Sequence, residues 1–316
     1  MRHVITGGSG FVGQRLAERL VLLNEKVVVF DLTPPKIVRN DCLEFIQGDV
    51  TSQNDLEKLN LQSDDVIYHL AARQFSGNVP RFRRYEWFEE VNVNGTLNLV
   101  KVMNLAGCSK IVFFSTDMTY GLPMTHPIQP NHPQNPLGPY GLSKVNAEKI
   151  LLNEKFDVTI FRPRLITGHG RLGILNILFK LIRSGLPVPI IGNGLNRYQM
   201  VGVDDCVDAA LLAYRSGFPR GAFNLGSLMP PTVKDLMKSL IIHAGSNSKL
   251  IYIPSFILKP VLKWMDFFSL TLLHKEQYLI ADLDILLDTE LTHENLGWYP
   301  KGDDSSLMKQ AYDSAK

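Results

Sequence analysis

Ten residues near the start of the chain, VITGGSGFVG at positions 4–13, hold four glycines between an apolar run and a helix-like pattern. Glycine weakens the interior of a helix or strand, so this turn must need backbone shapes or close approaches that a Cβ would block. Gly7, Gly10 and Gly13 form GxxGxxG between a predicted strand at 2–6 and a predicted helix at 10–24. The pattern predicts a tight turn at the first glycine, approach of a pyrophosphate at the second and close helix–strand packing at the third.

Strands and helices alternate along the first half of the chain. The predicted strands continue at 26–31, 43–50, 64–72, 110–116 and 157–163, and the predicted helices at 51–59, 86–107 and 141–155. Because the strands are continuous apolar runs, they indicate a parallel sheet covered on both faces. The sequence thus predicts an α/β fold, a Rossmann-type doubly wound parallel sheet over 1–163 with returns near 195–226. A smaller, mainly helical substrate lobe is expected over 164–316, above the carboxyl edge of the sheet.

Composition excludes several classes of protein. The 316 residues are 45% hydrophobic and 20% charged with a formal net charge of +2, so no global field favours nucleic acid or an anionic membrane. The three cysteines form no CxxC pair, and no His, Cys or carboxylate spacing completes a metal shell, so neither a disulfide framework nor a metal site is expected. The apolar stretch 253–273 is interrupted by Lys259, Pro260, Lys263 and Asp266, which argues against a membrane span. With no signal peptide evident, a cytoplasmic location is expected.

A carboxylate ends the second predicted strand. Asp31 lies 18 residues past Gly13, where a carboxylate can bind both ribose hydroxyls of NAD and would repel a 2′-phosphate. Lys36 and Arg39 lie nearby, so NADP is disfavoured without being excluded. The alternative interpretation is an ordinary aspartate that caps a turn at a strand end.

The segment YGLSK places Tyr140 and Lys144 four positions apart on one face of a predicted helix. A phenol has a pKa of about 10, so it must lose about 3 units to act as a base at neutral pH. An adjacent ammonium and the positive nicotinamide could supply that shift. Thr116, at the carboxyl edge of a strand, can hold the substrate oxygen, and the set predicts hydride transfer at a carbinol carbon. A second YxxxK, at Tyr312 and Lys316, has no such position.

A series of motifs in order along the chain carries a family resemblance. They are TGGSGFVG at 6–13, Asp31, GDV at 48–50, HLAA at 69–72, NVNGT at 92–96, STDMTYG at 115–121, YGLSK at 140–144, RP at 162–163, GNGLNRYQMVGVDD at 192–205 and LGWYP at 296–300. The chain resembles the extended short-chain dehydrogenases/reductases and, more narrowly, the NAD-dependent epimerase/dehydratase family. The resemblance implies an NAD-dependent epimerase or oxidoreductase that acts on a secondary hydroxyl, at C4, of a nucleotide sugar. It also implies a homodimer formed through the helix that carries the Tyr/Lys pair.

The resemblance assigns roles to individual residues. Thr116, Tyr140 and Lys144 would form the catalytic set, Asp49 and Val50 would hold the adenine, and Asn92 would support the cofactor or the active-site helix. The implied NAD-binding residues are Gly7, Gly10, Phe11, Val12, Asp31, Asp49, Val50, Ala71, Ala72, Asn92, Tyr140, Lys144 and Pro163. The implied substrate-binding residues are Thr116, Asp117, Met118, Arg164 and Arg197.

Departures from the family pattern narrow the reaction. Met118 stands where the sugar 4,6-dehydratases carry a glutamate, which argues against water elimination. Gln74 replaces the lysine of UDP-galactose 4-epimerases, so tight retention of NAD is not implied. The segment RPRLITGHG lacks the asparagine with which these epimerases contact the nucleotide. Their diphosphate-binding arginine is shifted by one place in this chain, to Arg197. The sugar, the nucleotide, and the choice between epimerase and net dehydrogenase stay open.

Two other functions share these motifs. The chain also resembles 3β-hydroxysteroid-type dehydrogenases in the segment FRPRLITGHG and in the apolar stretch 253–273. Within that stretch, Trp264, Phe267 and Phe268 could belong to the core, form a hydrophobic rim or receive an apolar substrate. A non-catalytic NAD-binding protein is the other alternative, although it would need no tyrosinate. The basic segment that carries Arg81, Arg83 and Arg84 could meet a diphosphate or be a solvated loop. Asp204 and Asp205 are expected to cap a helix.

Overall fold

A seven-stranded parallel sheet forms the centre of the molecule. The computed structural model describes residues 1–37, 40–75, 79–170, 175–268, 270 and 273–315. The strands follow the order β10-β6-β5-β4-β1-β2-β3, and every neighbouring pair is parallel. The seven strands are β1 (His3–Thr6), β2 (Val27–Asp31), β3 (Leu43–Gln47), β4 (Val66–His69), β5 (Lys110–Phe114), β6 (Asp157–Pro163) and β10 (Gly221–Leu225). The predicted doubly wound α/β fold is confirmed.

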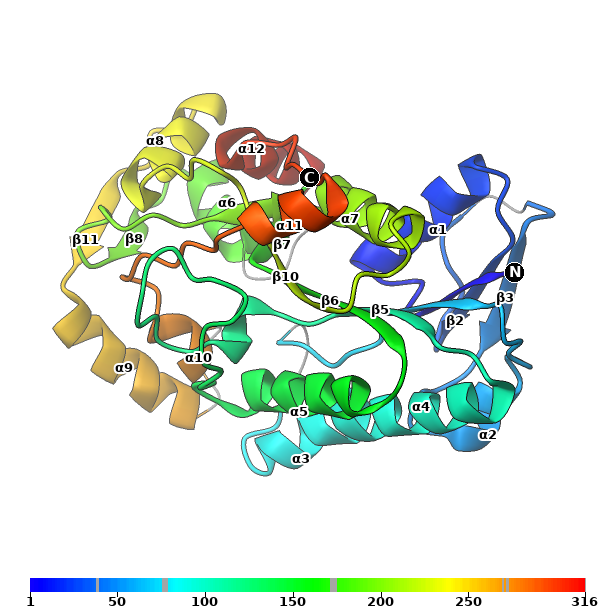
Figure 1. The fold of residues 1–316 in the computed structure, drawn as a ribbon. Helices are drawn as coiled ribbons and strands as arrows, with labels where there is room; N and C mark the ends of the chain where they lie inside the picture. Colours follow the sequence, from blue (N-terminus) through cyan, green and yellow to red (C-terminus); the bar gives the residue numbers. More distant parts are fainter. Residues whose placement is uncertain (38–39, 76–78, 171–174, 269, 271–272, 316) are drawn as a thin grey trace.

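Helices cover both faces of the sheet (Figure 1). On one face lie α2 (Gln53–Glu57), α3 (Arg84–Glu89), α4 (Gly95–Ala106) and α5 (Pro139–Asn153), and on the other lie α1 (Phe11–Leu22), α7 (Val203–Arg215) and α11 (Glu290–Leu296). Val4 and Ile5 are both fully buried, and they belong to separate hydrophobic clusters on the two sides. Successive strand residues point to opposite faces, so a sheet covered twice requires the unbroken apolar runs seen in the sequence.

The strand order reverses at β1. Thr6 pairs with Phe30 of β2 on one side and with His69 of β4 on the other. β1 is followed by α1 on one face and its neighbour β4 by α3 and α4 on the other, so a crevice opens beyond the carboxyl ends of these two strands. The glycine-rich turn leaves β1 at this position.

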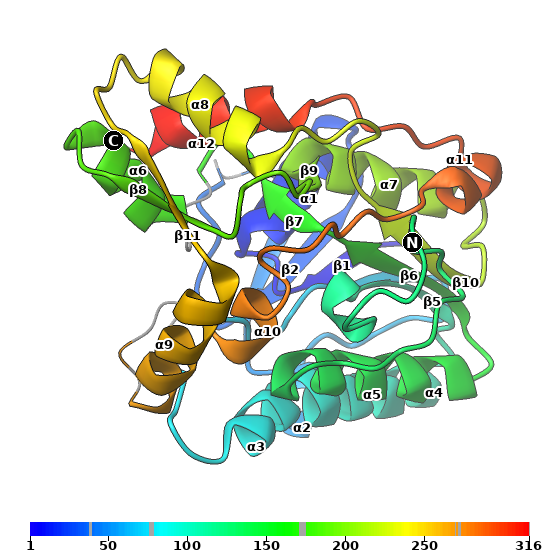
Figure 2. The same ribbon diagram turned by 90° about the vertical axis from the view of Figure 1, so that its left-hand side faces the viewer.

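The second half of the chain builds a lobe above that edge. It contains β7 (Leu165–Thr167) paired with β9 (Met200–Gly202), β8 (Val188–Ile191) paired with β11 (Leu250–Ile253), and the helices α6 (Leu175–Arg183), α8 (Val233–His243), α9 (Ser255–Phe267), α10 (Lys275–Tyr278) and α12 (Asp304–Ser314). Between these elements the chain returns to the main sheet, where β10 pairs with β6 and α7 packs on α1. The division at residue 163 stays a prediction. In Figure 2, α9 and α10 lie between α8 and α3, with α9 at the margin of the molecule.

The structure refines one local prediction and contradicts another. The predicted helix 86–107 begins at Arg84 and contains a π-helical turn, η1 (Glu90–Asn94), a feature that often marks functional sites. Asp205 does not cap α7, whose N-cap is Gly202; its carboxylate accepts hydrogen bonds from the backbone N–H groups of Lys301 (2.9 Å) and Gly302 (3.4 Å). In the described part of the chain, no helix is both long enough and apolar enough to cross a membrane.

Candidate active site

The glycine-rich turn has little room for side chains. Gly7 has a φ of +72°, and a Cβ added there would lie 2.5 Å from the Ala71 backbone nitrogen. A Cβ at Gly13 would lie 2.3 Å from the Gly7 carbonyl oxygen, whereas at Gly10 the nearest such contact is 3.2 Å. The first glycine therefore serves the turn and the third serves close packing, as predicted. Gly10 is the N-cap of α1 and has no side chain to cap the helix, so the N-terminus of α1 is left for another acceptor.

Asp31 ends β2 next to this turn. Its Oδ2 accepts a hydrogen bond from the Ser9 backbone N–H at 3.1 Å, and its Oδ1 accepts one from the Thr33 N–H at 3.3 Å. Asp31 also lines the large cavity at the edge of the sheet. The carboxylate thus orders the turn and still faces the cavity. Its capping of the turn is therefore compatible with the predicted binding of the ribose.

One cavity of about 930 Å³ runs along the carboxyl edge of the sheet, a volume typical of ligand sites. The predicted site residues that line it are Gly7, Gly10, Phe11, Val12, Asp31, Asp49, Val50, Ala71, Ala72, Thr116, Asp117, Met118, Tyr140, Lys144, Pro163 and Arg164. Among the described residues, the lining includes Tyr198 but neither Asn92 nor Arg197. In the same part of the chain, no group of three His, Cys, Asp or Glu residues is placed to hold a metal ion.

Asn92 lies in the π turn and supports the active-site helix from behind. Its Oδ1 accepts from the Arg73 backbone N–H at 2.8 Å, and its Nδ2 donates to the Arg73 carbonyl at 3.1 Å and to Ser143 Oγ at 2.9 Å. Ser143 belongs to α5, and Arg73 follows β4 at the cavity wall. The resemblance implied that Asn92 supports either the cofactor or the active-site helix, and these hydrogen bonds fit support of the helix.

Tyr140 and Lys144 lie one turn apart on α5, are 6% and 2% exposed, and both line the cavity. The Tyr140 ring contacts Phe75 and Phe88, with centroids 5.2 and 5.5 Å apart. Lys144 Nζ lies 4.4 Å from the centroid of the Phe113 ring. Burial lowers the pKa of Lys144 to about 7, and the Glu148 carboxylate opposes that shift. The side chain is therefore sensitive to any negative charge brought into the cavity.

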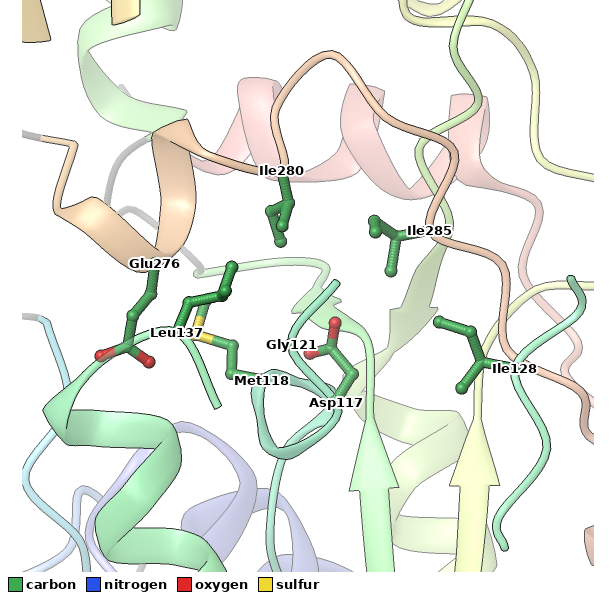
Figure 3. Close-up of a pocket in the computed structure, with 8 residues that line it drawn as sticks. All are labelled: Asp117, Met118, Gly121, Ile128, Leu137, Glu276, Ile280 and Ile285. Carbon is green, nitrogen blue, oxygen red and sulfur yellow. The ribbon is translucent and has the colours of Figure 1, made fainter. Parts of the chain in front are cut away.

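Glu276 of α10, which sequence reasoning missed, anchors the start of α5. Its Oε1 and Oε2 accept from the backbone N–H groups of Tyr140 and Gly141, each at 2.9 Å. Figure 3 shows the carboxylate extending toward this turn in a small pocket that shares Asp117, Met118 and Ile280 with the large cavity. Burial raises the pKa of Glu276 to about 7. The hydrogen bonds from the two N–H groups favour the charged form and oppose this shift. No local motif marks Glu276, since it lies 136 positions from Tyr140.

Asp117 and Arg164 form a buried ion pair beside Thr116. Arg164 Nη1 donates to Asp117 Oδ2 at 2.6 Å, and the guanidinium lies 4.5 Å from the centroid of the Tyr198 ring. Arg164 is 3% exposed, and among the described residues its Nε and Nη2 have no hydrogen-bond partner. Buried donors without partners are costly, so this end of the cavity suits a ligand that carries acceptor oxygens.

A second buried charge pair lies beneath the catalytic residues. Arg162 of β6 donates to Glu148 of α5 through Nε at 3.0 Å and through Nη2 at 2.5 Å. Ser115 also donates to Glu148, and Arg162 Nη1 donates to the Tyr120 hydroxyl at 3.0 Å. The network joins the ends of β5 and β6 to α5. It therefore fixes where Thr116 and Lys144 stand relative to each other.

Several expected contacts fall elsewhere. Arg197 is exposed, and its backbone N–H donates to Asp284 Oδ1 at 2.6 Å, so the diphosphate role expected for it is not supported. Trp264, Phe267 and Phe268 are also exposed, and the core interpretation of them was wrong. From the apolar stretch 253–273, only Leu273 is among the described residues that line the cavity, which removes the main support for a sterol site.

The loop that carries Arg81, Arg83 and Arg84 is only partly solvated, and these arginines are not among the described residues that line the cavity. Arg84 forms two 2.9 Å hydrogen bonds with Asp266, and Arg83 faces Glu86 at 3.3 Å. Among the described residues, the cavity lining contains none of the three arginines. The diphosphate role considered for them is thus not supported either. Tyr312, of the second YxxxK, packs against Phe179 with centroids 5.4 Å apart, and Lys316 lies outside the described residues.

The residues present fit a dinucleotide. The turn carries glycines at positions where a Cβ would collide, the N-terminus of α1 lines the cavity, and a carboxylate stands at the end of β2. A phosphate pair and a ribose have the oxygens and hydroxyls that this set recognises. Fold and site together define the class: a Rossmann-type dinucleotide-binding protein with a Thr/Tyr/Lys set at the edge of its sheet.

Comparison with known proteins identifies the family. The model of the NAD dependent epimerase/dehydratase family matches residues 3–226. The chain is 30% identical to an uncharacterised protein, y4nG, of Sinorhizobium fredii over 98% of this chain and 77% of that one. It is 30% identical to the UDP-glucose 4-epimerase of Mycolicibacterium smegmatis, over 78% of this chain and 83% of that one. The solved UDP-glucose 4-epimerase of Thermotoga maritima with UDP-glucose superposes with a TM-score of 0.79 at 25% identity, covering 99% and 98% of the two chains.

The protein belongs to the NAD dependent epimerase/dehydratase family and is an NAD-dependent enzyme. The resemblance drawn from the sequence motifs is confirmed, and so is the NAD cofactor. A purely non-catalytic role is correspondingly disfavoured.

Proposed function

We propose that this enzyme epimerises C4 of a UDP-sugar. The observation that carries the proposal is that Thr116, Tyr140 and Lys144 line the same cavity as the glycine turn and Asp31. The proteins of Mycolicibacterium smegmatis and Thermotoga maritima named above, both UDP-glucose 4-epimerases, support this substrate class. The Met118 side chain favours epimerisation over dehydration, since a thioether cannot act as the base for water elimination.

The chain's residues would handle the oxygen and its proton. When bound, NAD would supply the hydride acceptor and donor for the C4–H bond. Tyr140 takes the proton of the C4 hydroxyl as the carbon–oxygen double bond forms, and gives it back in the reverse step. Thr116 Oγ1 holds the same oxygen, and the Lys144 ammonium stabilises the phenolate of Tyr140. Inversion requires the intermediate ketone to present its other face before reduction.

The Asp117–Arg164 pair would bind the polar part of the substrate. Arg164 has two N–H groups that lack partners among the described residues, which suits oxygens of the sugar or its diphosphate. Asp117 neutralises the guanidinium, so the pair can stay buried without a net charge. Leu165 lines the cavity, and its segment RPRLITGHG lacks the nucleotide-binding asparagine of the UDP-galactose 4-epimerases, so the nucleotide would be held by other groups.

The test is direct conversion of substrate. The purified enzyme with NAD is incubated with UDP-glucose, UDP-galactose, UDP-glucuronate and their dTDP and GDP counterparts, and the anomeric protons are followed by NMR. We expect a UDP-sugar to reach a mixture of C4 epimers with no net NADH. Stoichiometric NADH without an epimer would instead establish a net dehydrogenase.

A matched pair of variants isolates the proposed base. Tyr140→Phe should lose a factor of about 10²–10⁴ in kcat, the usual contribution of a general acid–base group. Tyr312→Phe makes the same chemical change in the second YxxxK and should leave kcat unchanged. Nearly full activity in Tyr140→Phe would overturn the mechanism.

We also propose that the enzyme is a homodimer that pairs through α4 and α5. Leu97 and Leu105 of α4 and Leu142 and Leu152 of α5 are exposed, which gives the two helices an apolar outer surface. Light scattering should give twice the 35.5 kDa of one chain. Leu105→Glu should yield monomers, while Leu22→Glu on α1, equally exposed, should not. A wild-type monomer would refute the dimer.

A further inference from the structure

Helix α9 presents an apolar face to solvent. Phe256 is 78% exposed and Trp264 65%, and the other exposed apolar side chains of the helix are Ile257, Val261 and Phe267. Phe268 follows the helix, and Phe82, in the loop before α3, is 69% exposed. We call these seven residues the α9 patch. Single exposed apolar residues are ordinary, but a contiguous group containing Trp and four Phe marks a binding surface.

The patch is one surface built from two distant segments. The Arg81 guanidinium lies 5.0 Å from the Phe82 ring centroid, 4.6 Å from that of Phe267 and 5.3 Å from that of Phe268. The Trp264 and Phe268 centroids are 4.5 Å apart. Figures 1 and 2 both place α9 at the periphery of the molecule. A preformed aromatic surface costs little conformational entropy when it binds.

Two exposed cations lie at the patch. Lys263 is exposed on α9, and Arg81 is exposed among the aromatic rings. The carboxylate of α9, Asp266, is turned inward, where it pairs with Arg84 at 2.9 Å and with His274 at 3.3 Å. A second copy of the chain would bring cations against cations, whereas an anionic surface would complement them. Trp and Phe beside Lys and Arg on one helix are typical of helices that lie in the membrane interface.

The inner side of α9 leads to the active site. His274, which faces Asp266, stacks on Phe75 with centroids 4.7 Å apart, and Phe75 contacts Tyr140 at 5.2 Å. The next residues along the chain include Gln277 of α10, which lines the cavity. A surface bound to α9 would therefore lie next to the wall of the catalytic cavity.

We propose that the α9 patch docks the enzyme on a membrane surface that carries anionic phospholipid, with α9 parallel to that surface. A 13-residue helix is about 20 Å long, too short for a hydrocarbon core of about 30 Å, so α9 lies on the membrane and does not span it. The docking does not depend on which sugar the enzyme converts.

Vesicle flotation of the full-length enzyme tests this proposal. The probes are vesicles of phosphatidylcholine alone and of phosphatidylcholine with phosphatidylglycerol. Wild type should float with the anionic vesicles and bind the neutral ones at least about tenfold more weakly, because the cations add to apolar insertion. Trp264→Ser/Phe267→Ser should lose binding to both, and Lys263→Glu/Arg81→Glu should lose the preference for anionic lipid.

A matched control removes two exposed apolar residues elsewhere. Leu22→Ser/Ile242→Ser, on α1 and α8, should float like wild type. All variants change exposed side chains, and an unchanged thermal unfolding curve will verify that each is folded. No flotation of wild type, or equal flotation of Trp264→Ser/Phe267→Ser, would overturn the proposal. If that variant instead converts a dimer to a monomer, the patch joins two copies and the membrane proposal is wrong.

Discussion

The two ends that we assign to cofactor and substrate in the cavity are built in different ways. The proposed cofactor end is lined by residues between Gly7 and Ala72, and backbone geometry shapes it: a left-handed turn and glycines where a Cβ would collide. The substrate end is formed by buried charges brought from far apart in the sequence. Asp117 meets Arg164 across 47 positions, and Glu276 meets Tyr140 across 136.

This difference predicts different responses to mutation. At the cofactor end, polar groups face the cavity and the turn, so substitutions should act mainly on steric fit and on NAD affinity. At the substrate end, Asp117 and Arg164 are buried as an ion pair, and removal of one partner leaves the charge of the other without compensation. Substitutions there should lower the free energy of unfolding as well as activity.

The largest effect is expected for Arg164→Met. The variant leaves the Asp117 carboxylate 6% exposed and without its cation, which should cost about 3–5 kcal/mol of unfolding free energy in urea titrations. NAD affinity of the folded protein, measured by calorimetry, should change little. The matched double variant Asp117→Asn/Arg164→Met should recover part of the loss. A cost below about 1 kcal/mol for Arg164→Met would show that the ion pair contributes little.

Glu276 should make stability depend on pH. Its pKa is about 7 in the folded protein, above the ordinary value of 4.5, so folding favours the protonated carboxyl. The stabilising contribution is complete below about pH 4.5 and is lost as the pH rises through 7, by up to about 3 kcal/mol. Urea unfolding at a series of pH values should show this fall in wild type and a flatter profile in Glu276→Gln. Identical profiles would contradict this role of Glu276.

Two glycine variants distinguish a glycine needed for close packing of the turn from one needed for the approach of NAD. Gly13→Ala forces a Cβ to 2.3 Å from the Gly7 carbonyl and should cost about 1–3 kcal/mol of unfolding free energy. Gly10→Ala meets only the 3.2 Å contact, so it should fold nearly as well as wild type but bind NAD more weakly. Thermal unfolding and calorimetry on both variants measure the two effects. Equal stability of the two variants would refute the packing role of Gly13.

The smallest effect is expected for Asp31→Asn. An asparagine can still accept the Ser9 N–H bond, so stability should be almost unchanged. Loss of the carboxylate should weaken NAD binding about tenfold, the effect of a charged hydrogen bond to a ribose hydroxyl. Binding of NADP should improve relative to NAD. If calorimetry gives the same NAD affinity for variant and wild type, the carboxylate does not hold the ribose.

Sequence reasoning succeeded where the chemistry is local. The strand–turn–helix pattern around Gly7, the apolar strand runs and the one-turn spacing of Tyr140 and Lys144 each depend on residues a few positions apart. Their placement along one edge followed from the rule that parallel strands end together. The aromatic residues of α9 were misjudged because helical spacing shows that apolar residues share a face, but not whether another element covers that face.

The sequence by itself determined the doubly wound parallel sheet, the glycine turn after its first strand and the one-turn spacing of Tyr140 and Lys144, because steric limits on the backbone and helical periodicity act over short distances. Only the tertiary structure decided that Glu276 anchors the start of α5, that Arg162 pairs with Glu148, that Arg197 is exposed outside the described lining of the cavity, and that the α9 patch is exposed. The first two depend on which buried groups find a partner across the fold, and the last two on which surfaces other elements cover. Neither choice leaves a local pattern in the chain.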